Sequence, residues 1–201
     1  MMTESTETEN PEFEGAPRTK RPYEREELQR ASSLVLVNTG HGKGKSTAAF
    51  GTLMRAVARG WEVGVVQFMK SGKWHTGEEE ISRGLGVDWF SAGDGFSWES
   101  NDLEESEAKG VAGWEFSKGL ITAGDHRLLV LDEISYMMTW GWIDPVEVAA
   151  TVVNRPEHVN VILTGRSMAE EVIEIADTVT EMVKVKHAFE RKIRAMKGID
   201  Y

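Results

Sequence analysis

A phosphate-binding pattern begins at Leu34, where an apolar run leads into a glycine-rich turn and then directly into Lys45. This order is typical of a strand, a phosphate-cradling loop and a helix. Glycines Gly40, Gly42 and Gly44 let the backbone approach a polyphosphate and direct several amide groups at it. The residues therefore predict a P-loop, and hence binding of a nucleotide such as ATP.

The residues that follow the glycines add charge and a metal ligand to this loop. Lys45 can reach phosphate oxygens as a mobile cation, and Ser46 can offer its hydroxyl to Mg²⁺, with Mn²⁺ as the alternative ion. The helix that starts near Lys45 contributes the partial positive charge of its N-terminus. The expected nucleotide-binding residues of the loop are Gly40, His41, Gly42, Lys43, Gly44, Lys45, Ser46 and Thr47.

The glycine spacing of this loop is irregular. The usual pattern has a glycine five positions before the Gly-Lys-Ser glycine. Thr39 occupies that position here, and Gly40 follows one residue late. The altered spacing predicts an altered seating of the nucleotide.

A second signal is the apolar run Leu128–Leu131, which is followed directly by the acids Asp132 and Glu133. Downstream of a P-loop, an apolar strand that ends in an acid is typical of a Walker B element, whose carboxylate holds Mg²⁺ directly or through water. Either acid could be the metal ligand, and the other could orient Lys45 or the loop. The simpler structural alternative is that both acids cap a following helix.

Other candidate side chains lie at or near the ends of expected strands. Arg166 follows Thr164 and Gly165, and its fork of donors suits a polyphosphate. Gln67 leaves the second strand in the same region. Arg55 lies further along the first helix and reaches the site only if that face is open, and His187 could contact the base or ribose. Each has a structural alternative, namely a turn or solvated surface residue.

Phe96 and Trp98 form an aromatic pair in an expected loop that also contains Gly93 and Gly95. Loops seldom carry two such side chains without packing or binding. The pattern alone leaves two interpretations open. The pair fills the core, or it forms an apolar wall against a flat, largely apolar substrate.

The elements needed to position these residues alternate between strand and helix. Several strands are apolar on successive residues, as expected of parallel strands covered on both faces. We therefore expect one α/β domain with a doubly wound, mostly parallel sheet of about six strands and helices on both faces. Ligands in such sheets gather at the carboxyl ends of the strands. The expected strands are 34–37, 63–68, 87–90, 128–131, 159–163 and 179–183, and the expected helices are 45–59, part of 77–83, 102–122, 145–153 and 168–176.

Composition restricts the function classes. The chain of 201 residues has no cysteine, which excludes disulfides, thiolate metal sites and cysteine nucleophiles. Its net charge of −10 argues against nucleic acid as a partner. No apolar stretch is long enough to span a membrane. We expect a cytoplasmic protein with a disordered acidic tail at 1–22, a lead-in or lid segment at 23–33 and the catalytic domain at 34–201.

Taken together and in order, these motifs resemble the P-loop, RecA-like family of ATP:corrinoid adenosyltransferases. The segments that carry the resemblance are Thr39–Thr47, Val65–Phe68, Gly95–Glu99, Val130–Glu133, Leu163–Arg166, Val185–Phe189 and Gly198–Tyr201. It extends from about Leu34 to Tyr201.

The resemblance implies transfer of the 5′-deoxyadenosyl group of ATP to the Co(I) centre of a corrinoid, with release of triphosphate. Residues Gly40 to Thr47 would hold the triphosphate, in the reversed sense that the family uses, while Ser46 and Glu133 would bind Mg²⁺ and Arg166 would neutralise charge. Phe96 and Trp98 match the aromatic pair that lies beside the corrin and displaces its lower ligand. Lys45, Phe96, Trp98 and Glu133 are the expected catalytic residues. The implied partners are ATP, the corrinoid, an electron-donating reductase and a second copy of the chain in a homodimer.

Two other functions fit the motifs. A phosphoryl-transfer ATPase or kinase would use Asp132 and Glu133 as metal ligand and water-activating base. A non-catalytic nucleotide-binding or corrinoid-delivery protein would bind without turnover. The inorganic product separates adenosyl transfer from phosphoryl transfer, because the first releases triphosphate whereas the second releases ADP and phosphate.

Overall fold

Strands and helices alternate along the chain in the computed structural model, which describes residues 27–71, 76–93 and 103–200. The strands are β1 (Val35–Thr39), β2 (Val63–Ser71), β3 (Asp88–Gly93), β4 (Leu128–Asp132), β5 (Asn160–Thr164) and β6 (Thr178–Glu181). The helices are α1 (Lys45–Val57), α2 (Gly77–Gly84), α3 (Leu103–Ala123), α4 (Ser135–Thr139), α5 (Pro145–Val153) and α6 (Glu170–Glu174), followed by a 3₁₀ turn at Ala188–Arg191.

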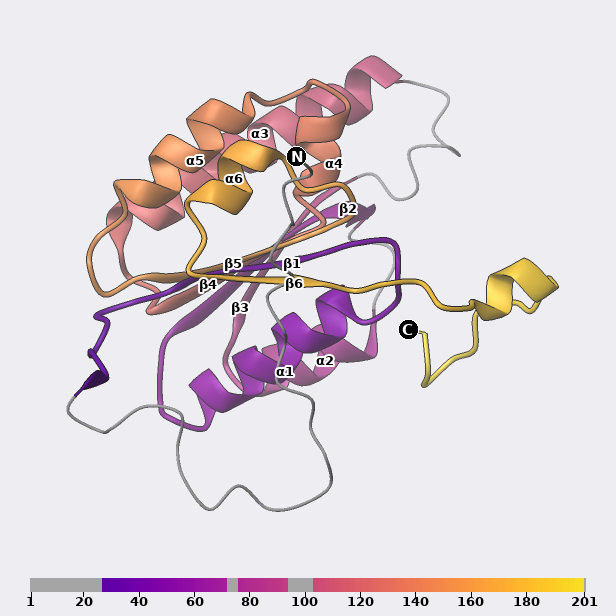
Figure 1. The fold of residues 1–201 in the computed structure, drawn as a ribbon, viewed down its shortest axis with the longest axis horizontal. Coiled ribbons are helices and arrows are strands. Elements are labelled where there is room, and N and C mark those ends of the chain that lie inside the picture. The colour runs from indigo at the N-terminus through magenta and orange to yellow at the C-terminus, as the bar shows by residue number, and fades with distance from the viewer. Residues whose placement is uncertain (1–26, 72–75, 94–102, 201) are drawn as a thin grey trace, which may run out of the picture. The chain divides into compact units, whose positions relative to one another are not determined.

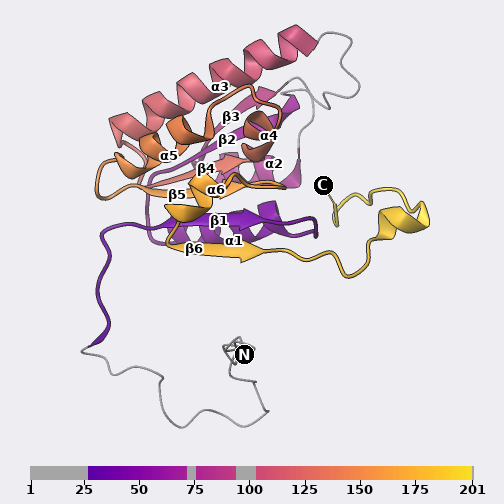
Figure 2. The same cartoon turned by 45° about the horizontal axis from the view of Figure 1, so that its top comes forward.

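All six strands form one parallel sheet in the order β3-β2-β4-β5-β1-β6 (Figures 1 and 2). Helices α1 and α2 cover one face, and α3 to α6 cover the other (Figure 1). The predicted fold class, a doubly wound parallel α/β sheet, is therefore confirmed. Residues 32–201 form one compact unit that contains all of these strands and helices.

The sheet is buried on both faces because its central strands are apolar on consecutive residues. Every residue of β4 is buried. Leu129 and Leu131 pack on one face with Trp114 of α3, and Val130 packs on the other with Leu53 of α1. Burying each side chain of this size stabilises the fold by about 1.5–3 kcal/mol. This core holds the carboxyl ends of the strands in register, where the candidate residues lie.

The expected element boundaries differ from the observed ones in a few places. Helix α4 was not expected, because five residues are too few to display a helical period. The expected strand at 179–183 ends instead at Glu181, because its partner β1 ends at Thr39, which pairs with Glu181. The next residue, Met182, still donates its amide to the Thr39 carbonyl oxygen (2.8 Å) and accepts from the Gly42 amide (2.6 Å). The expected tail at 1–22 lies outside the described residues.

Helices long and apolar enough to cross a membrane do not occur among the residues that the structure describes.

Candidate functional site at the carboxyl ends of the strands

The predicted phosphate loop, acidic pair and arginine gather at the carboxyl ends of three neighbouring strands. The loop follows β1, Glu133 follows β4, and Arg166 follows β5, which lies between them. Lys45 is within electrostatic range of Arg166, Glu133 and Asp132. These residues are distant in sequence, and the strand order brings them together.

Helix α1 begins directly at the loop, with Lys45 as its first residue. Gly44 precedes it with φ of +116°, and no side chain caps the helix. The first-turn amides of such a helix have no intrahelical partners and can bind an anion. The Lys45 ammonium donates to the Gly42 carbonyl oxygen at 2.7 Å. Burial, followed by the nearby Arg166 charge, lowers the pKa of Lys45, while Glu133 and Asp132 oppose that shift.

The irregular glycine spacing has a packing explanation. Gly40 has φ of +92°, and a Cβ atom there would lie 2.6 Å from the Met182 carbonyl oxygen. A Cβ atom at Gly42 would meet the same oxygen at 2.6 Å. The chain after β6 therefore passes so close to the loop that neither position accommodates a side chain. Gly44 differs, because its nearest neighbour would be the Met182 sulfur at 3.9 Å.

The two acids of the Walker B segment occupy different environments. Asp132 is fully buried: its Oδ1 accepts from the Thr164 hydroxyl (2.8 Å) and its Oδ2 from the Gln67 amide (3.0 Å). Glu133 is half-buried and has φ of +63°, a left-handed conformation that costs about 1–2 kcal/mol for a residue with a side chain. The geometry makes Glu133 the more accessible of the two carboxylates.

Arg166 is exposed, and its backbone is fixed from two sides. The Ser135 hydroxyl donates to its carbonyl oxygen at 2.6 Å. The preceding Gly165 has φ of +142° and leaves no room for a Cβ atom beside Ser135, while its amide donates to the Asn38 carbonyl oxygen at 3.2 Å. The turn after β5 is thus tied to both β1 and α4, which presents the guanidinium at the edge of the loop.

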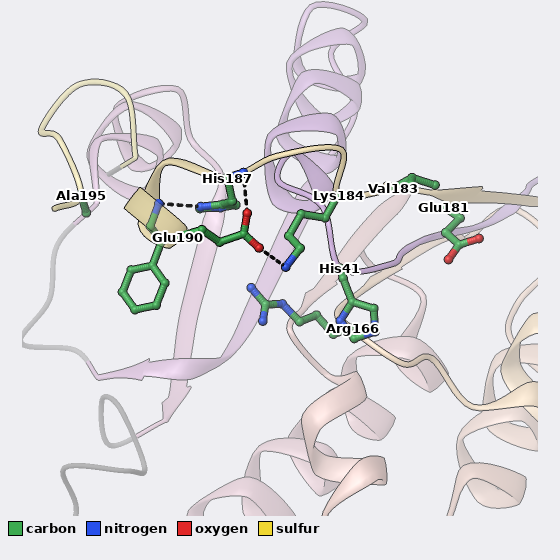
Figure 3. A pocket seen from close by; sticks show the side chains of 9 residues that line it. His41, Arg166, Glu181, Val183, Lys184, His187, Glu190 and Ala195 are labelled. Carbon is green, nitrogen blue, oxygen red and sulfur yellow. Dashed lines mark hydrogen bonds and ion pairs between the residues drawn. The ribbon is translucent and has the colours of Figure 1, made fainter. Parts of the chain in front are cut away.

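A cavity of about 870 Å³ lies between the loop and the chain after β6 (Figure 3). Lys184 and Glu190 form an ion pair at 2.5 Å, and the His187 amide donates to Glu190 Oε2 at 3.3 Å. The hydrogen bond from Lys184 holds the pKa of Glu190 below its usual range. The lining residues are His41, Arg166, Glu181, Val183, Lys184, His187, Phe189, Glu190 and Ala195.

The last described residue also contacts the phosphate loop. Asp200 forms an ion pair with Lys43 at 2.6 Å and accepts a hydrogen bond from the Met196 amide at 2.7 Å. The Lys43 contact, followed by the Met196 amide, lowers the pKa of Asp200. Residues from both ends of the domain therefore form this side of the site.

Tyr136 was missed by sequence reasoning. It is half-buried on α4, close enough to Arg166 and Glu133 to feel their charges, and burial raises its pKa. Its ring lies 5.4 Å from that of Trp140, centre to centre. Its position three residues after Glu133, just beyond a strand end, was the available signal.

One expected residue lies away from this cluster, and two others fall outside the part of the chain that the structure describes. Arg55 is exposed in the last turn of α1, roughly 15 Å along the helix from Lys45 by helical rise. Phe96 and Trp98 lie outside the described residues. Their roles stay predictions.

The donor set suits Mg²⁺ better than a metal held by protein ligands alone. Among residues 27–71, 76–93 and 103–200, no three His, Cys, Asp or Glu side chains gather as a ligand set. Mg²⁺ usually takes one or two carboxylates, with substrate phosphates and water completing its shell. Glu133 and the half-buried Ser46 at the start of α1 fit that pattern.

Comparison with known proteins agrees with the order of the motifs. Residues 31–201 match the family model described as ATP:corrinoid adenosyltransferase BtuR/CobO/CobP. The corrinoid adenosyltransferase CobA of Salmonella typhimurium is 41% identical over 175 residues, which cover 87% of this chain and 89% of that protein. The corrinoid adenosyltransferase of Escherichia coli K12 is 39% identical over the same shares of each chain. That of Pseudomonas aeruginosa is 42% identical over 84% of this chain and 83% of its own. The chain belongs to the ATP:corrinoid adenosyltransferase family.

Proposed function

We propose that this site transfers the 5′-deoxyadenosyl group of ATP to the cobalt of a reduced corrinoid. The Co(I) electron pair attacks C5′, a Co–C bond forms, and the C5′–O bond breaks with its electron pair leaving on triphosphate. No general base is needed, because no proton is removed. The observation that carries the proposal is the convergence of Lys45, Glu133 and Arg166, in a chain of this family. Of these three residues, Arg166 also lines the nucleotide-sized cavity.

The protein would stabilise the leaving group mainly by fixed charge. The uncapped amides of α1, Lys45 and Arg166 would surround the triphosphate, so that its growing charge meets positive partners already in place. Ser46 and Glu133 would hold Mg²⁺, which when bound supplies further positive charge to the phosphate oxygens. Asp132 would support the site without binding the metal ion itself, because both of its carboxylate oxygens already accept hydrogen bonds.

The cavity would receive the nucleoside end of ATP. Its lining combines the apolar Val183 and Phe189 with the polar His41 and His187, a composition that suits a base and ribose. C5′ would then lie between the cavity and the loop, where cobalt can approach in line. Phe96 and Trp98 would form the apolar wall beside the corrin. Arg55 would assist only from the outer rim.

We also propose a cytoplasmic homodimer that receives electrons from a separate reductase. Co(I) is strongly reducing, and the chain has no cysteine thiol that could supply the electron.

The test is an anaerobic incubation of the protein with Mg-ATP and a chemically reduced corrinoid. The corrinoid spectrum should shift to that of an alkylated species, and one triphosphate should appear for each adenosyl group transferred. ADP and phosphate would instead identify a phosphoryl-transfer enzyme. Tight ATP binding without either product would identify a binding protein.

A further inference from the structure

We propose that Thr164 is a positioning residue that sets the direction of Glu133. This inference rests on the proposed function, because it assigns Glu133 to the metal ion of the bound triphosphate. Thr164 would not touch the nucleotide, and would act through the backbone of Glu133.

A single buried hydroxyl joins the two acids of the Walker B segment. Thr164 is fully buried, and its Oγ1 accepts a hydrogen bond from the Glu133 amide at 2.9 Å. The same hydroxyl donates to Asp132 Oδ1 at 2.8 Å. A hydroxyl has one proton and two lone pairs, so it can serve both partners at once.

Strand β2 supplies a hydrogen bond to the other oxygen of Asp132. Gln67 is fully buried and donates through its amide nitrogen to Asp132 Oδ2 at 3.0 Å. The Asp132 carboxylate is therefore held at both oxygens, and it fixes the Thr164 proton in turn. The result is a continuous path of hydrogen bonds from Gln67 through Asp132 and Thr164 to the backbone of Glu133.

Glu133 needs such support because its backbone is left-handed, with φ of +63°. Residues with a side chain adopt that region only where surrounding contacts hold them there. The hydrogen bond to Thr164 fixes the amide at the start of this residue, and hence the direction in which its Cβ leaves the chain. Thr164 is also the last residue of β5, two residues before Arg166, so the residue that supports the proposed metal ligand lies next to the turn that carries the proposed phosphate ligand.

The chain offers matched variants for a test. Thr164→Val keeps the shape but removes the hydroxyl, and Thr164→Ser keeps the hydroxyl. Binding of Mn²⁺ to the ATP-loaded full-length protein would be measured by electron paramagnetic resonance, with thermal unfolding recorded for each variant. Loss of a residue that orients a metal ligand typically weakens metal affinity by about 10–100-fold. We expect that range for Thr164→Val and less than about threefold for Thr164→Ser.

Glu133→Gln tells whether Thr164 acts through Glu133. If it does, Thr164→Val should add less than about threefold in the Glu133→Gln background, because coupled residues are non-additive. An undiminished effect in that background would overturn the inference, as would unchanged Mn²⁺ affinity in Thr164→Val. If Glu133→Gln itself leaves Mn²⁺ affinity unchanged, the metal role in the proposed function fails, and this inference fails with it. Thr164→Cys replaces Thr164→Val if the valine variant does not fold.

Discussion

Gly42→Ala tests whether the phosphate loop is shaped by the chain after β6. The added Cβ atom would lie 2.6 Å from the Met182 carbonyl oxygen, and 2.8 Å from both the Met182 carbonyl carbon and the Val183 oxygen. All three are backbone atoms, so the clash is not relieved by a side-chain rotation. Gly42 itself is not in the left-handed region, and the effect is therefore steric.

The expected magnitude follows from two contributions. Overpacking of this kind costs about 1–3 kcal/mol. Displacing Met182 also weakens the 2.6 Å hydrogen bond from the Gly42 amide, which contributes about 0.5–1.5 kcal/mol. We expect the docking of residues 182–183 on the loop to lose about 1.5–4.5 kcal/mol, which corresponds to about 10- to 2,000-fold more frequent opening.

Amide hydrogen exchange of ATP-free protein measures this opening. The Met182 amide donates to the Thr39 carbonyl oxygen and should exchange faster by that factor in Gly42→Ala. Gly51→Ala is the control, because Gly51 is exposed inside α1 with nothing within 4 Å of an added Cβ atom. Alanine is more favourable than glycine inside a helix, so this variant should be more stable than the unaltered protein by about 0.5–1 kcal/mol. Exchange at Met182 that is unchanged in Gly42→Ala would refute the reasoning.

Three further predictions concern charge and the aromatic pair. The negative phosphates of bound ATP should raise the lowered pKa of Lys45. ATP affinity should therefore be full at pH values below the pKa that Lys45 has in the ATP-free protein, and it should fall as the pH rises through that pKa. Titration calorimetry between pH 8 and 11 measures this, and an affinity that stays constant over the range would contradict it. Asp200→Asn should free Lys43 and speed proteolysis of the C-terminal residues at neutral pH, whereas in the unaltered protein the Asp200 contact should be lost as pH falls through its lowered pKa. Trp98→Ala should leave ATP binding intact and slow the reaction from Co(II) but not from Co(I), which corrinoid spectra can follow, and equal slowing from both states would count against it.

The fold was predictable because its signals are local. Consecutive apolar residues, as in Leu128–Leu131, identify a buried parallel strand, and the Gly-Lys-Ser sequence marks the loop and helix that follow β1. The same signals placed the phosphate loop, Glu133 and Arg166 directly after strand ends, and the sheet brings those ends together.

The remaining features depend on contacts between distant segments. Nothing in the sequence around Gly40 or Gly42 indicates that Met182 packs on them, because that contact depends on β6 lying beside β1. Likewise, Asp132 and Glu133 look equivalent in sequence. Only the positions of Gln67 and Thr164 distinguish Asp132, which is buried and hydrogen-bonded at both oxygens, from the more accessible Glu133.

The position of β1 has a consequence for how the chain acquires its site. This strand pairs with β5 and β6, with Val35 beside Val161 and Leu36 beside Thr178. Both edges of the strand that leads into the phosphate loop therefore stay unpaired until the last third of the chain is available. Pairings this distant in sequence form slowly, because a long loop must close first. During synthesis, nucleotide binding should appear late and abruptly, after most of the core could already have formed.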